Sequence, residues 1–307
     1  MATSSDDKVR HSIITAVALI VLLFQAGCVT LDEKAPPAPA PPPAASPTPP
    51  IDGITIASFN IRIFSNNSRS DAELAKIADL LQNYDVIAIQ ELRDEQVLGR
   101  TAEILRQRGI EYGYEVNNPV GRGVKERYAF LYRRDRVQLL HAGRLYQEQH
   151  DEFIREPFYA TFDSGEFDFT LLTIHVLFGD SEAERRPEIE ELASVYQAVQ
   201  DADPAEQDVI LMGDFNFPPD DEGFSNLKAV PTMTFLIAPP AKTTISDTSL
   251  YDNFWFQSQH VREYVGRAGV ERYDETMFNN DDHVASKAVS DHRPIWAKFR
   301  ITGPDDD

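Results

Sequence analysis

Short apolar runs that end in polar, chemically reactive residues constrain the fold of this chain more than any other feature. Four such runs have the length and β-branched character of strands: Ile54–Ile61 (ITIASFNI), Tyr84–Gln90 (YDVIAIQ), Phe167–Ile174 (FDFTLLTI) and Val209–Met212 (VILM). Between the first two lies Asp71–Leu81, whose apolar residues recur at helical spacing. A mixture of strands and helices predicts α and β layers packed on sheets, not one purely parallel sheet.

The same patterns extend over the rest of the folded part. They predict helices at 102–107 and 184–199, a hairpin formed by 158–162 with 167–174, and further strands at 128–132, 137–140, 251–256, 261–265 and 295–299. No repeat of solenoid period is present. The folded part, residues 51–302, has no cysteine, so packing without disulfides must hold it together.

The beginning of the chain is typical of an export signal, predicted over residues 1–28. A polar start carrying Lys8 and Arg10 precedes the apolar run Ile13–Phe24, which is too short for a comfortable membrane span. Cys28, the only cysteine, follows two small residues, and this arrangement resembles the lipobox of bacterial lipoproteins. We therefore expect an exported protein whose Cys28 carries lipid and anchors it to a membrane of the bacterial cell envelope. Because Gln25 stands where the lipobox usually has Leu, an ordinary cleaved signal and a secreted protein is the alternative.

Two further segments lie outside the folded part. Residues 29–50 are predicted to be a linker, because Ala35–Pro50 consists almost entirely of Pro, Ala, Ser and Thr and cannot bury apolar surface. Residues 303–307 are predicted to be an acidic tail. With 29 basic and 50 acidic residues the net charge is −21, which argues against nucleic-acid binding driven by a basic surface. The negative net charge remains compatible with an enzyme that binds phosphate through a metal ion and a few arginines.

Polar residues accumulate where the predicted strands end. Asp214 and Asn216, two residues apart, would offer oxygen ligands on one face of an extended chain to a hard cation or to a phosphate-bound water. Ends of neighbouring strands converge in space, so several segments can supply one pocket. At strand ends these are Asn60, Glu91, His175, Asp214 and Asn216, and Asp291 with His292 precede the final strand.

Eight segments in unbroken order resemble the endonuclease/exonuclease/phosphatase superfamily, and within it the deoxyribonuclease I branch. They are FNIR (59–62), QELRD (90–94), GRGVKERYAFLYR (121–133), REP (155–157), TIH (173–175), LMGDFN (211–216), YD (251–252) and SDHRP (290–294). The resemblance implies a four-layered α/β sandwich, with two mixed β-sheets packed face to face and flanking helices. It also implies a monomer that hydrolyses DNA with Mg²⁺ or Mn²⁺.

Roles for individual residues follow from this resemblance. Glu91 would be the principal metal carboxylate, with Asn60 and Asp291 near it, while Asp214 and Asn216 would orient the attacking water and hold the phosphate. The remaining catalytic residues would form two His–carboxylate pairs, His175 with Glu126 and His292 with Asp252.

Substrate and calcium contacts are implied in the same way. Arg155 would meet a phosphate oxygen, Arg62 and Arg93 would face the DNA groove, and Asp151 and Glu156 would retain part of a structural Ca²⁺ site. The chain departs from the family at Val124, where a groove-contacting Tyr is usual, and in the loop 241–249, which differs from the family's calcium-binding loop.

The chemistry of phosphodiester cleavage agrees with these roles. It needs an activated water, positive charge on the pentacoordinate phosphate, and a proton for the leaving oxygen. Two His–carboxylate pairs move protons near pH 7, and a metal ion supplies the charge that an acidic protein lacks. Sphingomyelin, an inositol phosphate or a cyclic nucleotide are alternative substrates. A non-catalytic surface binding module is the remaining alternative, which the retention of every site residue opposes. Which histidine is the base, and whether single or double strands are preferred, stays open.

Overall fold

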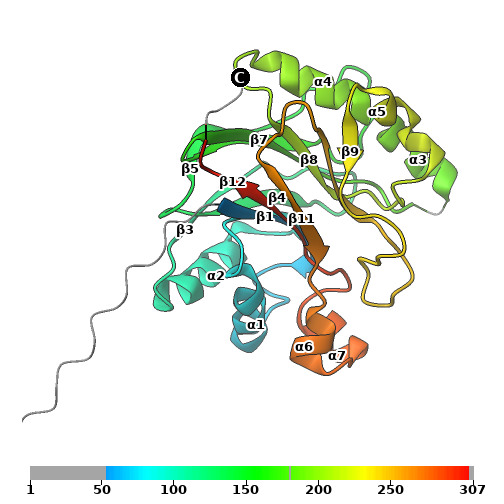
Figure 1. Cartoon of the computed structure of the whole chain (residues 1–307). Coiled ribbons are helices and arrows are strands. Elements are labelled where there is room, and N and C mark those ends of the chain that lie inside the picture. Colours follow the sequence, from blue (N-terminus) through cyan, green and yellow to red (C-terminus); the bar gives the residue numbers. More distant parts are fainter. Residues whose placement is uncertain (1–52, 180, 304–307) are drawn as a thin grey trace, which may run out of the picture. The chain divides into compact units, whose positions relative to one another are not determined.

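Two six-stranded mixed sheets form the centre of the protein (Figure 1). The computed structural model describes residues 53–179 and 181–303, so the predicted signal, Cys28, the linker and the end of the acidic tail lie outside the described residues. The strand order of the first sheet is β11 (Tyr264–Val270), β12 (Ile295–Arg300), β1 (Gly53–Phe64), β2 (Val86–Leu92), β4 (Arg127–Arg133), β3 (Tyr112–Val116). Only β1 and β2 are parallel neighbours in it.

The second sheet repeats this arrangement. Its strand order is β5 (Gln138–Leu145), β6 (Phe158–Ser164), β7 (Phe167–His175), β8 (Val209–Asp214), β10 (Asp252–Gln257), β9 (Met233–Phe235). Here β7 and β8 are the one parallel pair. Each sheet therefore has a central pair of parallel strands whose carboxyl ends lie at the same edge.

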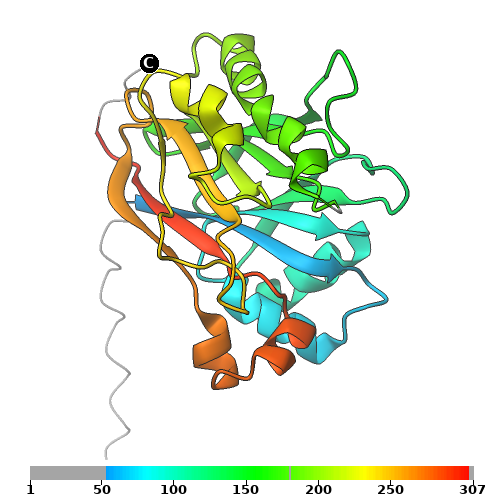
Figure 2. The same ribbon diagram turned by 90° about the vertical axis from the view of Figure 1, so that its right-hand side faces the viewer.

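Helices cover the outer face of each sheet, as the two views in Figures 1 and 2 show. The first sheet packs against α1 (Asp71–Leu81), α2 (Glu95–Gln107), α6 (Tyr273–Phe278) and α7 (Asp282–Ala288). The second packs against α3 (Glu182–Glu190), α4 (Leu192–Ala202), α5 (Ser225–Ala229) and the short 3₁₀ turn Glu222–Phe224. The predicted four-layered sandwich is confirmed. No helix among the described residues is both long enough and apolar enough to pass through a bilayer.

The alternation of side chains along each strand builds these layers. In β1, Ile54 and Ile56 belong to the core between the two sheets, while Ala57 and Phe59 belong to the core under the helices. Both faces of the central strands are thus apolar, which explains why these strands read as nearly continuous apolar runs.

Several elements differ from the sequence prediction. The helix expected at 184–199 is two helices that meet at Glu191, and the first of them contains Pro187. The helix expected at 102–107 begins earlier, where the side chain of Asp94 caps α2 by accepting from the Val97 N–H. The strand expected at 261–265 lies at Tyr264–Val270. Six short elements among the described residues were not predicted: β3, β9, α5, α6, α7 and the 3₁₀ turn Glu222–Phe224.

Candidate active site at the polar end of the inter-sheet core

The core between the sheets turns from apolar to polar at one end. Along β7 the inward side chains run from Phe167, Phe169 and Leu171 to Thr173 and His175. The same change occurs in β8, where Asp214 follows Ile210 and Met212 in the inward series, and in β1, where Asn60 continues the series of Ile54 and Ile56. The strand pattern that makes the core therefore also directs these polar groups into it.

Strand register brings three of the predicted residues into one row. His175 on β7 is the register partner of Asp214 on β8, and Asp214 is in turn the partner of Asp252 on β10. Because β10 runs antiparallel to β8, Asp252 reaches this edge at the start of its strand. His292, just before β12, reaches it in the same way and forms a bridge with Thr244. The starts of antiparallel strands thus contribute alongside the carboxyl ends, and the position of His292 before the final strand agrees with the sequence prediction.

Unusual backbone conformations position Asp214 and its neighbours. Gly213 has φ +146°, and a Cβ there would lie 2.0 Å from the carbonyl oxygen of Ile174, so β8 can approach β7 this closely only with glycine. Asn216 has φ +52°; its N–H donates to Asp214 Oδ1 (3.0 Å) and its side-chain amide donates to the carbonyl of Val176 (2.8 Å). The turn that follows β8 therefore fixes both residues of the predicted pair.

Glu91 lies beside Asn60 because β2 departs from regular pleating at its end. In a regular strand Gln90 and Glu91 would point to opposite faces. Glu91 instead has φ +59°, within a register irregularity between β1 and β2. Its Oε2 accepts from the N–H of Ile63 (2.9 Å), and its Oε1 lies 3.3 Å from the amide nitrogen of Asn60. That same nitrogen donates to Asp214 Oδ2 (3.0 Å).

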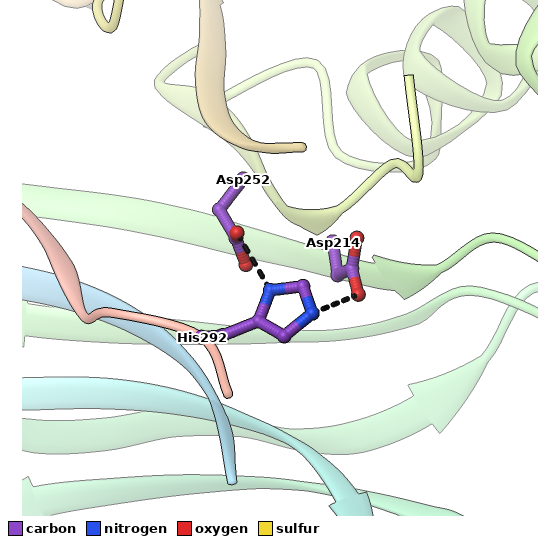
Figure 3. A group of neighbouring side chains, drawn as sticks. All are labelled: Asp214, Asp252 and His292. Atoms are coloured by element: carbon purple, nitrogen blue, oxygen red, sulfur yellow. Dashed lines mark hydrogen bonds and ion pairs between the residues drawn. The ribbon is translucent and has the colours of Figure 1, made fainter. Parts of the chain in front are cut away.

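Two histidines, each paired with a carboxylate, face the same oxygen of Asp214. His175 Nδ1 is 2.9 Å from Glu126 Oε2, and His292 Nδ1 is 2.8 Å from Asp252 Oδ2. Each histidine directs its other ring nitrogen, Nε2, to Asp214 Oδ2 at 3.6 Å. Figure 3 shows the His292 ring between Asp252 and Asp214. Both predicted His–carboxylate pairs are therefore formed.

Burial and these contacts shift the acidity of the site. Burial alone would lower the pKa of His292, but the carboxylates of Asp252 and Asp214 raise it to about 10. Burial raises the pKa of Asp252, so both members of this pair favour binding of a proton. Burial would also raise the pKa values of Asp214 and Glu126. The charges of His292 and His175 lower the pKa of Asp214, and His175 with Arg155 and Arg93 lowers that of Glu126 to about 2.

These groups open into a cavity of about 640 Å³. The loop between Thr244 and Tyr251 and the helix α7 form its other walls. Seven predicted site residues line it, namely Asn60, Glu91, His175, Asp214, Asn216, Asp291 and His292. Glu126 and Asp252 lie behind the two histidines that they hold.

The three predicted arginines differ in their surroundings. Arg155 is buried and donates through Nε and Nη2 to the carbonyls of His175 (2.9 Å) and Val176 (3.2 Å), so it fixes the end of β7. Arg93 Nη2 lies 3.3 Å from Glu126 and 3.6 Å from Glu91, and thus links a histidine partner to the predicted metal carboxylate. Arg62 is about half exposed, with Nε 3.9 Å from Asp291. Their contacts with a substrate stay predictions.

The predicted calcium residues lie apart from this cavity. Asp151 is exposed, has φ +61° and forms an ion pair with Arg122. Glu156 is partly buried, and its charge helps to raise the pKa of Glu148 after the larger effect of burial. A Ca²⁺ ion here would have to replace Arg122 as the partner of Asp151.

Two sets of residues at the site have the donor atoms that a divalent cation needs. Asp214, Asp252 and His292 have ligand atoms within 4.8 Å of one another, which is consistent with a metal site. The second set is Glu91 with Asn60, whose Oδ1 is buried without a hydrogen-bond partner among the described residues. An unpaired buried amide oxygen beside a carboxylate fits a hard cation. In the first set, His292 Nδ1 and Asp252 Oδ2 are already paired with each other at 2.8 Å.

Four residues that sequence reasoning did not single out hold the site together. Ser290 donates to the carbonyl of Asn60 (2.6 Å) and accepts from the N–H of His292 (3.2 Å). The Tyr128 hydroxyl accepts from the His175 N–H (3.0 Å), and the Thr243 hydroxyl accepts from the Asp252 N–H (3.1 Å). Gln90 bridges the sheets by donating to Thr173 (2.9 Å). Ser290, Tyr128 and Gln90 belong to the motifs SDHRP, GRGVKERY and QELRD. Their place in these motifs is the sequence feature that could have identified them as site residues.

Comparison with known proteins agrees with this geometry. The model of the endonuclease/exonuclease/phosphatase family matches residues 57–292. A protein of Thioalkalivibrio sp. (strain K90mix) named deoxyribonuclease is 32% identical over 263 residues, which cover 80% of this chain and 71% of the relative. Deoxyribonuclease-1 of Homo sapiens is 32% identical over 264 residues, covering 79% of this chain and 90% of the relative.

A solved structure shares the fold at lower identity. Humanized TDP2 of D. rerio superimposes with a TM-score of 0.59 at 17% identity, over 81% of this chain and 100% of that one. The residues matched by the family model include both histidines and the two carboxylates paired with them. This chain therefore belongs to the endonuclease/exonuclease/phosphatase family.

Proposed function

We propose that this protein is a divalent-metal-dependent endonuclease that hydrolyses the phosphodiester bonds of DNA. One observation carries the proposal: two His–carboxylate pairs direct their Nε2 atoms to a single oxygen of Asp214, at 3.6 Å each. A phosphodiester needs one group that takes a proton from water and one that gives a proton to the leaving oxygen. Two histidines that face one carboxylate oxygen meet this need.

The hydrogen bonds support different roles for the two histidines. The raised pKa of His292 keeps its ring protonated at neutral pH, so its Nε2 is suited to donate a proton to the leaving oxygen. Glu126, with a pKa of about 2, is ionised and can only accept, so the Nδ1 of His175 carries the hydrogen toward it. In this arrangement His175 Nε2 receives the proton of the attacking water. Asp214 and Asn216 orient that water.

Glu91 and Asn60 would hold a Mg²⁺ or Mn²⁺ ion, with Asp291 at the rim of the same cavity. When bound, the ion would supply the positive charge that stabilises the developing negative charge on the phosphate. The buried and unpaired Oδ1 of Asn60 supports this set of ligands. Arg93, which contacts Glu91 and Glu126, keeps these two carboxylates in place beside the reacting group.

The names of the relatives support DNA as the substrate, because the proteins at 32% identity are called deoxyribonucleases. The test is a panel of substrates under one set of conditions: supercoiled plasmid, sphingomyelin, a cyclic nucleotide and bis(p-nitrophenyl) phosphate, each with Mg²⁺ and with EDTA. We expect nicking of the plasmid that EDTA abolishes. Hydrolysis of sphingomyelin without any nicking would refute DNA as the substrate and leave only the phosphodiesterase class.

Export and anchoring form a separate proposal, which concerns residues outside the described part of the chain. We propose that Cys28 carries lipid and that the Pro-rich linker spaces the enzyme from a membrane of the cell envelope. Several acyl chains on one cysteine hold firmly, whereas one chain holds only marginally. In a bacterial host, the Cys28→Ser protein is expected in the soluble fraction and the wild type with the membranes. A Cys28→Ser protein that stays with the membranes contradicts the anchor.

A further inference from the structure

Phe178 is an exposed aromatic side chain at the edge of the catalytic cavity. It follows β7 by three residues, and 58% of its surface is exposed, while every other phenylalanine among the described residues is at least partly buried. Phe178 lines the same cavity as His175, Asp214 and His292. An apolar ring this exposed, in a cavity otherwise built for a charged phosphate, has no role in the chemistry described above.

A stack of side chains holds this ring in place. The guanidinium of Arg185 lies 4.9 Å from the centre of the Phe178 ring and 4.7 Å from the centre of the Phe217 ring. The Arg185 side chain is only 11% exposed, and within the described part of the chain its ion-pair contact is Glu182 at 3.9 Å. Its Nε and Nη1 atoms are buried without hydrogen-bond partners among those residues. Contact with two aromatic faces therefore supports the position of this cation, which in turn packs on the Phe178 ring.

A second cavity continues from the first on this side. It has a volume of about 410 Å³, is lined by Arg185, Phe217 and Lys242, and shares Asn216 and Tyr251 with the catalytic cavity. Arg185, which packs on the Phe178 ring, is part of the wall of this second cavity, so a polynucleotide strand that extended from the histidines into it would pass near Phe178. The base next to the cleaved phosphate would then meet the Phe178 ring.

We propose that Phe178 is a stacking platform for an unpaired base next to the scissile phosphate, so that the enzyme prefers single-stranded DNA. This inference rests on the proposed nuclease function and specifies the form of its substrate. In a duplex both faces of each base are already covered by its neighbours, whereas a base in a single strand has a free face for an aromatic ring. Stacking also gives affinity without neutralising phosphates, which suits a protein with a net charge of −21.

The experiment measures steady-state cleavage of three substrates: a single-stranded DNA oligonucleotide, its duplex, and a chain of the same length built from abasic nucleotides. We expect Phe178→Ala to raise KM for the single strand by about tenfold with kcat within twofold, because the platform acts on binding. Cleavage of the duplex and of the abasic chain should change less than twofold. Phe178→Trp, which keeps an aromatic face, should retain wild-type KM. Leu140→Ala, an exposed apolar truncation on β5, serves as the matched control.

A binding measurement separates stacking from charge. In the background of an inactive His292→Ala enzyme, Phe178→Ala should lower the affinity for the single strand by the same factor at every salt concentration, because no phosphate contact is lost. An equal effect of Phe178→Ala on all three substrates, or no effect on the single strand, overturns the platform while leaving the nuclease assignment intact. Absence of DNA cleavage by the wild type overturns the proposed function, and the platform with it.

Discussion

His175 and His292 come from different sheets, yet each places its Nε2 atom 3.6 Å from Asp214 Oδ2. The first belongs to β7 of the second sheet and the second precedes β12 of the first sheet. The proposed catalytic arrangement therefore depends on how the two sheets pack. Any change that shifts one sheet against the other should reduce activity even when both histidines are intact.

The proposed position of the metal ion gives a first prediction. Glu91→Gln should raise the Mg²⁺ concentration needed for half-maximal activity by at least about tenfold, since it removes a charged ligand. Asp252→Asn should lower kcat and leave that concentration unchanged. Calorimetric titration with Mn²⁺ provides a readout independent of turnover. Normal Mn²⁺ binding by Glu91→Gln together with lost binding by Asp252→Asn would place the metal at Asp214, Asp252 and His292 instead.

Stability against acid gives a second prediction. The pKa of Glu126 is about 2 in the folded protein and near its ordinary value of 4.5 when unfolded. A lowered pKa contributes stability that is fully present above the unfolded value and is lost as the pH falls from about 4.5 through 2. The contribution at pH 7 is on the order of 3 kcal/mol.

Urea denaturation of the wild type and of Glu126→Gln at several pH values measures this contribution. The gap in unfolding free energy should be largest at neutral pH and should shrink below pH 4.5. Glu190→Gln, at an exposed position of α3, is the control and should show no such gap. A gap that stays constant down to pH 3 would mean that the ionisation of Glu126 contributes nothing.

The binding of DNA gives a third prediction. Arg62→Ala should raise KM for DNA while sparing hydrolysis of bis(p-nitrophenyl) phosphate, because the half-exposed Arg62 lies outside the catalytic cavity. With only two to four phosphate contacts, log affinity should fall against log salt with a slope of roughly −2 to −4, and Arg62→Ala should reduce that slope by about one. Arg93→Ala should impair both substrates, since Arg93 contacts Glu91 and Glu126. An unchanged slope in Arg62→Ala would remove this residue from the interface.

Calcium gives a fourth prediction. If Asp151 and Glu156 hold Ca²⁺, the melting temperature of the wild type should rise with free Ca²⁺ above the dissociation constant, because an ion that binds only the folded state stabilises it. Asp151→Asn should abolish the rise. Arg122→Ala should strengthen it, since Arg122 pairs with Asp151 in the absence of the ion. Melting that is insensitive to millimolar Ca²⁺ would exclude the site.

Local patterns determine which parts of this structure can be predicted from sequence. The strands β1, β7 and β8 and the helix α1 have strong periodicity, and they lie where the sequence predicts them. The strand β3 escapes prediction because its five residues include Gly113 and Glu115, and its pairing with β4 comes from tertiary contact. The break at Glu191 escapes it because apolar spacing continues across the break.

The same limit on prediction from sequence applies to the candidate site. The motifs identify the residues that are predicted to contact the phosphate, since their chemistry is local to each strand end. The positive φ of Glu91 and the packing of Arg185 against Phe217 depend on contacts between segments that are distant in the sequence. Arg155 illustrates the difference: its motif is recognisable, yet its bonds to the carbonyls of His175 and Val176 become visible only in three dimensions.

The most direct test of the central claim compares plasmid nicking by the wild type, His175→Ala, His292→Ala and the control His260→Ala, each with Mg²⁺ and with EDTA. His260 lies outside the catalytic cavity, so its replacement should leave the rate unchanged. Loss of either catalytic histidine should lower kcat by roughly two to four powers of ten without unfolding the protein, the usual scale for a lost acid or base. EDTA should abolish activity in all four. Near-normal nicking by a folded His292→Ala enzyme, or nicking that persists in EDTA, would contradict the account.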